Sequence, residues 1–291
     1  MRGITCGFAM SLRKKDNVAS AAFEPGITNN GLDFSMLQIH QLSALSDNYI
    51  YLLHEPDGGE TAVVDPAVAE PVLEALRQNG WKLDYVFNTH HHGDHVGANL
   101  QLKQLTGCKI VGAGADRDRI PGIDITVGDG DTIMLGRQSF RVIATPGHTS
   151  GHVVYYCADS EALFCGDTLF SLGCGRLFEG SAEEMWQSLQ KLKSLPGNTR
   201  VYCAHEYTEA NGRFALTIET DNADLQRRVN EVAELRHRNL STLPSTMALE
   251  LATNPFLREH SPSLRQAVAA GENDSPAVVF AKVRLLKDQF R

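Results

Sequence analysis

The sequence lacks several features that would place it in a specialised class of protein. Its six cysteines form no C-x-x-C pair, and no repeat or low-complexity tract is present. No apolar run reaches the roughly 18 residues that a transmembrane helix needs. Basic residues are outnumbered, with 27 Lys and Arg against 35 Asp and Glu and a net charge of −8. These absences exclude a disulfide-stapled scaffold and a membrane-spanning protein, and they argue against a polynucleotide as the partner.

The composition is that of a globular protein with a large core. Hydrophobic residues make up 42% and charged residues 21% of the 291 positions, and this length corresponds to roughly two domains at about 150 residues each. The cysteines have no regular spacing, which indicates isolated thiols in a reducing compartment. We therefore expect a cytoplasmic protein in preference to an organellar one, and a monomer.

The first 35 residues differ from the rest of the chain. A short apolar stretch at residues 7–10 precedes basic residues 13–15, the reverse of the order in a secretory signal. Asp16 and Glu24 argue against an organellar transit peptide. We expect residues 1–35 to be a disordered leader or to reflect an upstream start codon, with ordered protein directly after them.

Short β-rich segments alternate with helical ones as far as residue 206. We expect helices at residues 68–79, ended by Gly80, and at residues 182–194, where Ser181 and Glu184 form a capping box. Period-two patterns and turn residues predict strands at residues 49–53, 61–64, 83–87, 132–135, 140–144, 153–156, 162–165 and 201–203. This alternation predicts an α/β domain of packed layers.

The β-rich pattern ends after Glu206. Residues 222–240 have apolar side chains at helical spacing with charges on the other face. Ser275 and Pro276 are a favoured pair at the start of a helix, so we expect a final helix from there. The chain is thus divided near residues 206–210 into an α/β domain and a small all-helical one.

Four of the 11 histidines lie within residues 90–95, directly after an expected strand. In extended backbone His90 and His92 point the same way and can reach one cation. Gly93 permits a turn, after which Asp94 and His95 can face a second cation. Imidazole with carboxylate suits Zn(II), Fe(II) or Mn(II).

Three further candidate ligands lie where expected strands end, namely His148, Asp167 and His205. Loops at strand ends gather at one edge of a layered α/β domain, so these side chains can converge on the histidine cluster. Together they supply seven ligands, which suits two metals about 3.5 Å apart.

The chain resembles the metallo-β-lactamase superfamily through THHHGDH, TPGHTSGH, FCGD and the late His205. GCGR at residues 173–176, AHEYT at 204–208, NPFLR at 254–258 and RLLKDQF at 284–290 narrow the resemblance to the hydroxyacylglutathione hydrolase (glyoxalase II) family. The resemblance covers residues 36–291. It implies an αββα sandwich over residues 36–206 followed by a helical substrate-binding domain over residues 207–291.

The resemblance also implies a ligand set and a reaction. Two divalent metals, Zn(II) or else Fe or Mn, would be bound, the first by His90, His92 and His148 and the second by Asp94, His95 and His205, with Asp167 between them. A hydroxide that bridges the metals, assisted by Asp94, would attack the thioester of S-D-lactoylglutathione and release glutathione and D-lactate. This reaction is the second step of methylglyoxal detoxification.

Substrate contacts are implied by the same resemblance. Arg284 and Lys287 would bind the glycine carboxylate of glutathione, although a solvated helix flank would also explain their spacing. Arg176 and Tyr207 match other glutathione contacts. Phe178 stands where many members of the family have tyrosine, so the contact of that hydroxyl is lost.

Neighbouring residues receive other expected roles. His152 matches the motif but not the ligand set, and we expect it to support the site. Asp65 is expected to orient a ligand histidine or to form a turn with Pro66. His91 is not expected to be a ligand.

Other functions remain open at this point. A lactonase or lactamase of the same fold would not need Arg284 and Lys287, and a glutathione-persulfide dioxygenase of the superfamily lacks the helical domain. A nuclease would favour a basic surface. A metal-buffering module is the non-enzymatic alternative, and hydrolysis of S-D-lactoylglutathione that is abolished by chelation would exclude it.

Overall fold

Two six-stranded mixed sheets lie at the centre of the fold. The computed structural model describes residues 35–290, so the expected leader lies outside the described residues apart from Ser35. The first sheet has the order β1 (Gln38–Ala44), β2 (Asn48–His54), β3 (Thr61–Val64), β4 (Tyr85–Phe87), β5 (Lys109–Ala113) and β6 (Ile125–Val127). The second has the order β14 (Ser245–Thr246), β13 (Arg200–Cys203), β10 (Ala162–Gly166), β9 (Val153–Cys157), β8 (Gln138–Ala144) and β7 (Thr132–Leu135).

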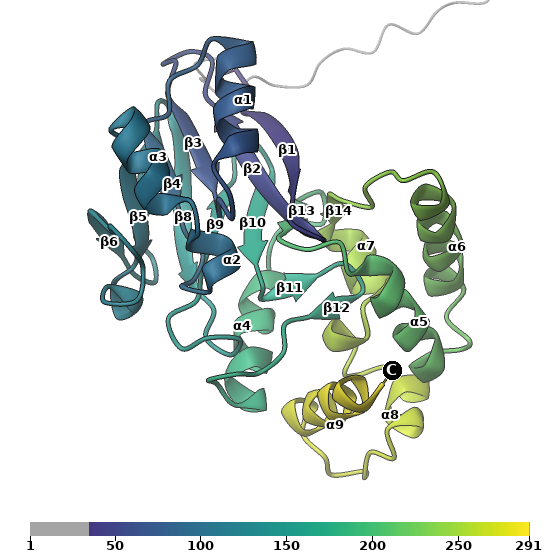
Figure 1. The fold of residues 1–291 in the computed structure, drawn as a ribbon. Coiled ribbons are helices and arrows are strands. Elements are labelled where there is room, and N and C mark those ends of the chain that lie inside the picture. The colour runs from purple at the N-terminus through teal and green to yellow at the C-terminus, as the bar shows by residue number, and fades with distance from the viewer. Residues whose placement is uncertain (1–34, 291) are drawn as a thin grey trace, which may run out of the picture. The chain divides into compact units, whose positions relative to one another are not determined.

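The buried side chains alternate along β2 because the first sheet is covered on both faces. Tyr51 and Leu53 join the core between the two sheets, whereas Ile50 and Leu52 join a second core under helices on the outer face. Those helices are α1 (Glu70–Asn79), which ends at Gly80 in the left-handed conformation, and α3 (Asn99–Thr106) (Figure 1).

Helix α4 (Ala182–Lys193) packs against the other sheet. Its capping box joins the Ser181 side chain to the backbone of Glu184 and the Glu184 side chain to the backbone of Ser181. Met185, Leu189 and Leu192 are buried against this sheet and belong to the same continuous core as the side chains between the sheets. The layers are therefore helix, sheet, sheet and helix, as the family resemblance implies.

A helical region follows the sandwich and packs beside the short hairpin of β11 (Leu169–Phe170) and β12 (Gly173–Cys174) (Figure 1). Its helices are α5 (Thr208–Ile218), α6 (Ala223–His237), α7 (Met247–Thr253), α8 (Pro262–Ala267) and α9 (Pro276–Gln289), with a 3-10 turn at η2 (Pro255–Leu257). Helix α9 begins with Ser275 as its N-cap, as predicted. Buried glutamate and asparagine side chains of α7 and its C-cap hold the hairpin, since Asn254 Nδ2 donates to the carbonyls of Phe170 and Gly173.

The region after Glu206 is not purely helical. The two-residue strand β14 pairs antiparallel with β13, with Ser245 opposite Val201 and Thr246 opposite Arg200. A strand this short carries no period-two signal, and its position depends on backbone pairing with a strand more than 40 residues earlier in the chain. The sequence also gave no expectation for β1, β5 or β6, which complete the first sheet.

The five described cysteines are buried and free of disulfides, in agreement with the expectation of isolated thiols. Among the described residues, no helix is long and apolar enough to span a membrane.

Candidate metal centre

The strand ends and loops that carry the predicted ligands meet at one edge of the sandwich. His90 and His92 follow β4, and Asp94 and His95 lie on the short helix α2 (Gly93–Val96). The remaining three come from the ends of β8, β10 and β13, and they are His148, Asp167 and His205. The fold thus brings all seven predicted residues together.

Six of the seven side chains form two groups of three, and Asp167 is the seventh. In the first, His92 Nδ1 lies 3.1 Å from His90 Nε2 and 3.1 Å from His148 Nε2. These three residues could hold one metal ion. In the second, Asp94 Oδ2 lies 3.5 Å from both His95 Nε2 and His205 Nε2, and these three could hold another.

Asp167 lies between the two groups. Its Oδ2 is 3.4 Å from His148 Nε2, and its Oδ1 is 3.4 Å from His205 Nε2 and 3.6 Å from His95 Nε2. Each carboxylate oxygen therefore faces a different group. Within residues 35–290, Asp167 Oδ1 and His95 Nε2 are buried with no hydrogen-bond partner, and a bound cation would satisfy both atoms. The donor set fits two divalent cations.

In three of the histidines, Nδ1 forms a hydrogen bond that fixes the orientation of the ring, while Nε2 faces the ligand groups. His95 Nδ1 lies 3.0 Å from Asp65 Oδ2 and His205 Nδ1 lies 2.8 Å from Asp47 Oδ1, while His148 Nδ1 lies 2.8 Å from the carbonyl of Arg176. Such partners hold a ligand ring in place and leave its other nitrogen available.

Asp65 and His152 lie beside the ligand groups, and their polar atoms are engaged in hydrogen bonds that support the site. Asp65 could be grouped with His90 and His95 as a ligand, but its carboxylate already accepts from the backbone N and Oγ1 of Thr89 at 2.8 and 2.6 Å. His152 Nε2 accepts a hydrogen bond from the backbone N of Asp167 at 3.1 Å. Both positions agree with the supporting roles expected from the sequence.

The electrostatics of the site differ between the two ligand groups. Burial lowers the pKa of His90 well below its usual value, so that ring is neutral. Burial would raise the pKa of the Asp167 carboxyl, yet the imidazoles of His95, His205 and His148 hold it well below its usual range. Burial alone would lower the pKa of His95, but the charges of Asp167 and Asp65 raise it to about 9. Without a cation His95 therefore carries a proton at neutral pH, and a cation bound by the second group would displace that proton.

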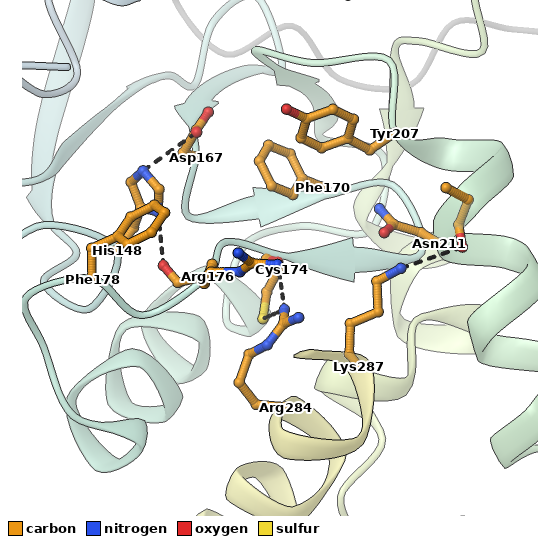
Figure 2. Close-up of a pocket in the computed structure, with 11 residues that line it drawn as sticks. His148, Asp167, Phe170, Cys174, Arg176, Phe178, Tyr207, Asn211, Arg284 and Lys287 are labelled. Atoms are coloured by element: carbon orange, nitrogen blue, oxygen red, sulfur yellow. Dashed lines mark hydrogen bonds and ion pairs between the residues drawn. The ribbon is translucent and has the colours of Figure 1, made fainter. Parts of the chain in front are cut away.

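A pocket of about 420 Å³ opens directly beside these groups. Figure 2 shows His148 and Asp167 at one end and Arg284 and Lys287 at the other. The pocket is lined by His148, Asp167, Phe170, Cys174, Arg176, Phe178, Tyr207, Ala210, Asn211, Arg284 and Lys287. All five residues implied as substrate contacts are therefore among its lining residues.

Aromatic rings cover the metal-ligand side of the pocket. The Tyr207 ring stacks on the His205 ring, with 4.8 Å between centroids and 4° between planes. Phe178 is 61% exposed, and its ring lies 5.2 Å from that of His148. Phe170 packs against both His205 and Tyr207. These faces offer an apolar path between the metal groups and the basic end of the pocket.

The two basic residues of α9 that line the pocket, Arg284 and Lys287, differ in burial and in their partners. Arg284 is only 5% exposed; its Nη1 donates to the carbonyl of Cys174 at 3.0 Å and its Nη2 to Asp288 Oδ1 at 2.9 Å. A solvated flank is therefore wrong for Arg284. Lys287 Nζ contacts the carbonyl of Ala210 at 3.3 Å, and burial together with Arg284 lowers the pKa of Lys287 to about 8.

Sequence reasoning missed several residues of the site. Asp47 lies in the turn between β1 and β2 and is 158 positions from His205, which it contacts. Asn48 Nδ2 donates to Asp94 Oδ2 at 3.0 Å. Phe170 and Asn211 line the pocket. None of these four has a local spacing signal, because each joins the site through a contact distant in sequence.

The comparisons with known proteins agree with this geometry. Residues 45–205 match the metallo-beta-lactamase superfamily, and residues 206–290 match the hydroxyacylglutathione hydrolase C-terminus. The hydroxyacylglutathione hydrolase of Methylococcus capsulatus is 60% identical over 257 residues, which cover 88% of this chain and 100% of that protein. That of Rhodospirillum rubrum is 52% identical over 256 residues, again covering 88% of this chain and 100% of that protein.

Solved structures give the same architecture. ETHE1 from Myxococcus xanthus is 25% identical, with a TM-score of 0.59 over 87% of this chain and 100% of that one. The di-iron-bound form of TTHA1623 is also 25% identical, with a TM-score of 0.54 over 76% of this chain and 100% of that one. The predicted αββα fold and the predicted family are confirmed. The chain belongs to the hydroxyacylglutathione hydrolase family of the metallo-beta-lactamase superfamily.

Proposed function

We propose that the protein is a metal-dependent thioester hydrolase that cleaves S-D-lactoylglutathione, and other S-2-hydroxyacylglutathiones, to glutathione and the 2-hydroxy acid. The observation that carries this proposal is the pocket that runs from His148 and Asp167, beside the ligand groups, to Arg284 and Lys287 of α9. Its two ends match the two ends of the substrate, since a thioester suits the cations and an anionic tripeptide suits the basic end. The names of the relatives supply the substrate class.

The proposed ligands are those implied by the resemblance. His90, His92 and His148 would hold one cation and Asp94, His95 and His205 the other, with Asp167 between them. Two divalent cations held here would polarise the thioester carbonyl and make hydroxide available near neutral pH. Mixed imidazole and carboxylate donors suit Zn(II), which we propose as the metal, with Fe or Mn as alternatives.

Asp94 is the proposed proton acceptor. Neighbouring His95 and the hydrogen bond from Asn48 offset the effect of burial and lower the pKa of the Asp94 carboxyl, so it is ionised at neutral pH. Its carboxylate can take the proton of the attacking water. A leaving thiolate needs little protonation, because the pKa of a thiol is about 8.5.

The basic end of the pocket binds the tripeptide in this proposal. Lys287 and the exposed Arg176 supply positive charge for the glycine carboxylate, while the rings of Tyr207 and Phe178 contact the remainder. Arg284 lines the same end and fixes its shape through the Cys174 carbonyl. Residues 36–206 would thus carry the chemistry and residues 207–291 the recognition of the tail.

The cellular setting follows from the same residues. Buried thiols without disulfides suit a reducing cytoplasm, where we place the reaction. The ligand groups and the basic end of the pocket lie on the same chain, and we propose a monomer.

The test is hydrolysis of S-D-lactoylglutathione by the Zn-loaded protein. The reaction is monitored through the loss of thioester absorbance. We expect turnover that chelation abolishes and that added Zn²⁺ restores. A β-lactam, a lactone and glutathione persulfide are tested separately as alternative substrates. Oxidation of the persulfide is measured with an oxygen electrode. Faster turnover of any of these than of the thioester would contradict the proposal.

A further inference from the structure

A polar network outside the ligand groups joins four separate segments of the chain. It consists of His91, Asp116, Arg119, Ser150 and Glu179, which we call the Glu179 network. Asp116 ends the 3-10 turn η1 (Gly114–Asp116), and Arg119 follows in the next turn. The other three lie in the loops after β4, β8 and β12. The network therefore connects loops that the sheets alone leave apart.

Two carboxylates accept nearly all of its hydrogen bonds. Glu179 accepts from Arg119 Nη1 at 2.5 Å and from the backbone N and Oγ of Ser150 at 2.7 and 2.8 Å. Asp116 accepts from Arg119 Nη2 at 2.5 Å, and its other oxygen lies 3.0 Å from His91 Nδ1. Arg119 thus bridges the two carboxylates, and charge-assisted bonds of this kind fix geometry strongly.

The fit around Asp116 is tight. Its side chain is completely buried, and a Cβ added at Gly151 would lie 2.0 Å from Asp116 Oδ1. The loop after β8 can therefore approach this carboxylate only because residue 151 has no side chain. Its position is determined by Asp116 from one side and by Glu179 from the other.

Two of the connected loops carry the first ligand group, and a third lies against it. His91 stands between His90 and His92, and Ser150 follows His148 by two residues. Glu179 follows Phe178, whose ring lies 5.7 Å from that of His92 and 5.2 Å from that of His148. The network therefore reaches all three histidines of the first group through the backbone.

The second ligand group has different supports. Asp65 holds His95 and Asp47 holds His205, and neither aspartate has a recorded contact with the Glu179 network. Asp65 also accepts from Thr89, whose Oγ1 lies 3.0 Å from His90 Nδ1, so it supports both groups, whereas Glu179 and Arg119 contact the loop that carries His148. A change at Glu179 or Arg119 should therefore affect the first cation more than the second.

We propose that Glu179 and Arg119 are positioning residues for the group of His90, His92 and His148, and that they affect the affinity of that group for its divalent cation more than the affinity of the second group. The inference rests on the metal centre of the proposed function and assigns two residues to it that lie outside its ligand set. Loss of a supporting hydrogen-bond partner typically lowers metal affinity by about 10- to 100-fold.

The experiment measures how tightly each zinc ion is held. Zn-loaded wild type, Glu179→Ala, Glu179→Gln and the control Glu183→Ala are dialysed against increasing concentrations of a chelator, and zinc is counted by elemental analysis. Glu183 is a suitable control because its carboxylate contacts Gln187 on its own helix. We expect Glu179→Ala to lose one of its two zinc ions at a chelator concentration about 10-fold or more below that of wild type. The control should match wild type.

Two further results separate positioning from general instability. Glu179→Gln keeps an oxygen that can accept from Ser150 but loses the charge that faces Arg119, so it should lie between Glu179→Ala and wild type. Thermal unfolding in excess Zn²⁺ should be nearly unchanged, because Glu179 is at the surface. If Glu179→Ala does not fold, the same measurement is made on Arg119→Lys and Glu179→Gln.

Specific outcomes would overturn the inference. Retention of both zinc ions as in wild type, or equal weakening of both, would show that the network does not act on one group. Combining Glu179→Ala with Asp47→Asn should loosen both ions, and a double variant that still loses only one would also contradict it. If wild type fails to cleave S-D-lactoylglutathione while Glu179→Ala loses one zinc ion, the proposed substrate fails and this inference stands.

Discussion

Lys287 has a charge that should be lost within a pH range suitable for assay. Burial is the main cause of its low pKa, and the positive charges of Arg284 and Arg213 add to it, so that the pKa falls to about 8 despite the opposing charge of Asp288. A lysine amine loses its positive charge as the pH rises above its pKa. If Lys287 binds the glycine carboxylate, binding of the substrate should weaken on the alkaline side of pH 8.

The size of the effect follows from the pKa. A lysine with a pKa of about 8 is about nine-tenths protonated at pH 7 and about one-tenth protonated at pH 9. If the neutral amine supports about one-tenth of full kcat/KM, as expected for loss of the contact, kcat/KM should fall roughly fivefold over this range. A charge-assisted contact contributes roughly 1.5–3 kcal/mol, and we expect Lys287→Met to lose about tenfold in kcat/KM at pH 7 because the site is only partly buried.

The assay is kcat/KM for S-D-lactoylglutathione from pH 6.5 to 9.5, corrected for spontaneous hydrolysis. Lys287→Met should show a low kcat/KM without the step near pH 8, and Lys287→Arg should remove the step while keeping more of the activity. Lys282→Met is the matched control, because Lys282 lies on the same helix but contacts Ala269 and Asp274 instead of the pocket. An alkaline step of equal size in Lys287→Met and wild type would refute the assignment.

Three other outcomes are expected. Asp167→Ala removes the carboxylate between the two ligand groups, so elemental analysis should find fewer than two metal ions per chain; two ions retained would show that Asp167 does not bridge. Glu250→Ala leaves the buried Ser171 hydroxyl and the backbone N of Leu172 without their acceptor, and urea unfolding should show a loss of roughly 3 kcal/mol. Removal of residues 1–35 should leave turnover unchanged, because the contacts of Ser35 are exposed or partly buried; an inactive or insoluble truncated protein would contradict this.

Most helices with capping signals were predictable to within a few residues. The capping box at Ser181, the left-handed Gly80 and the pair Ser275 and Pro276 each mark a helix end in the structure where the sequence places one. Capping depends on residues within one turn, so a local pattern is sufficient. Strand β14 was missed because its two residues are a strand only through pairing with β13.

The candidate site also has residues that local sequence predicts and residues that it does not predict. The positions of the seven ligand candidates follow from histidine and aspartate at strand ends, a pattern visible in the sequence. Asp47 and Asn48 could not be found by spacing, because they reach His205 and Asp94 through contacts between distant parts of the chain. The burial of Arg284 was likewise hidden, since its partner at Cys174 lies 110 positions away.

The sequence by itself determined the chemistry of this protein, because the type of ligand and the close spacing of His90, His92, Asp94 and His95 decide which cations can bind. It also determined the family, because the motifs are contiguous. Only the tertiary structure decided which ligand group each oxygen of Asp167 faces, and that Arg284 is paired with Asp288 inside the fold. These properties depend on distances between segments that local preferences do not fix, and they are set when the two sheets and the helical region pack together.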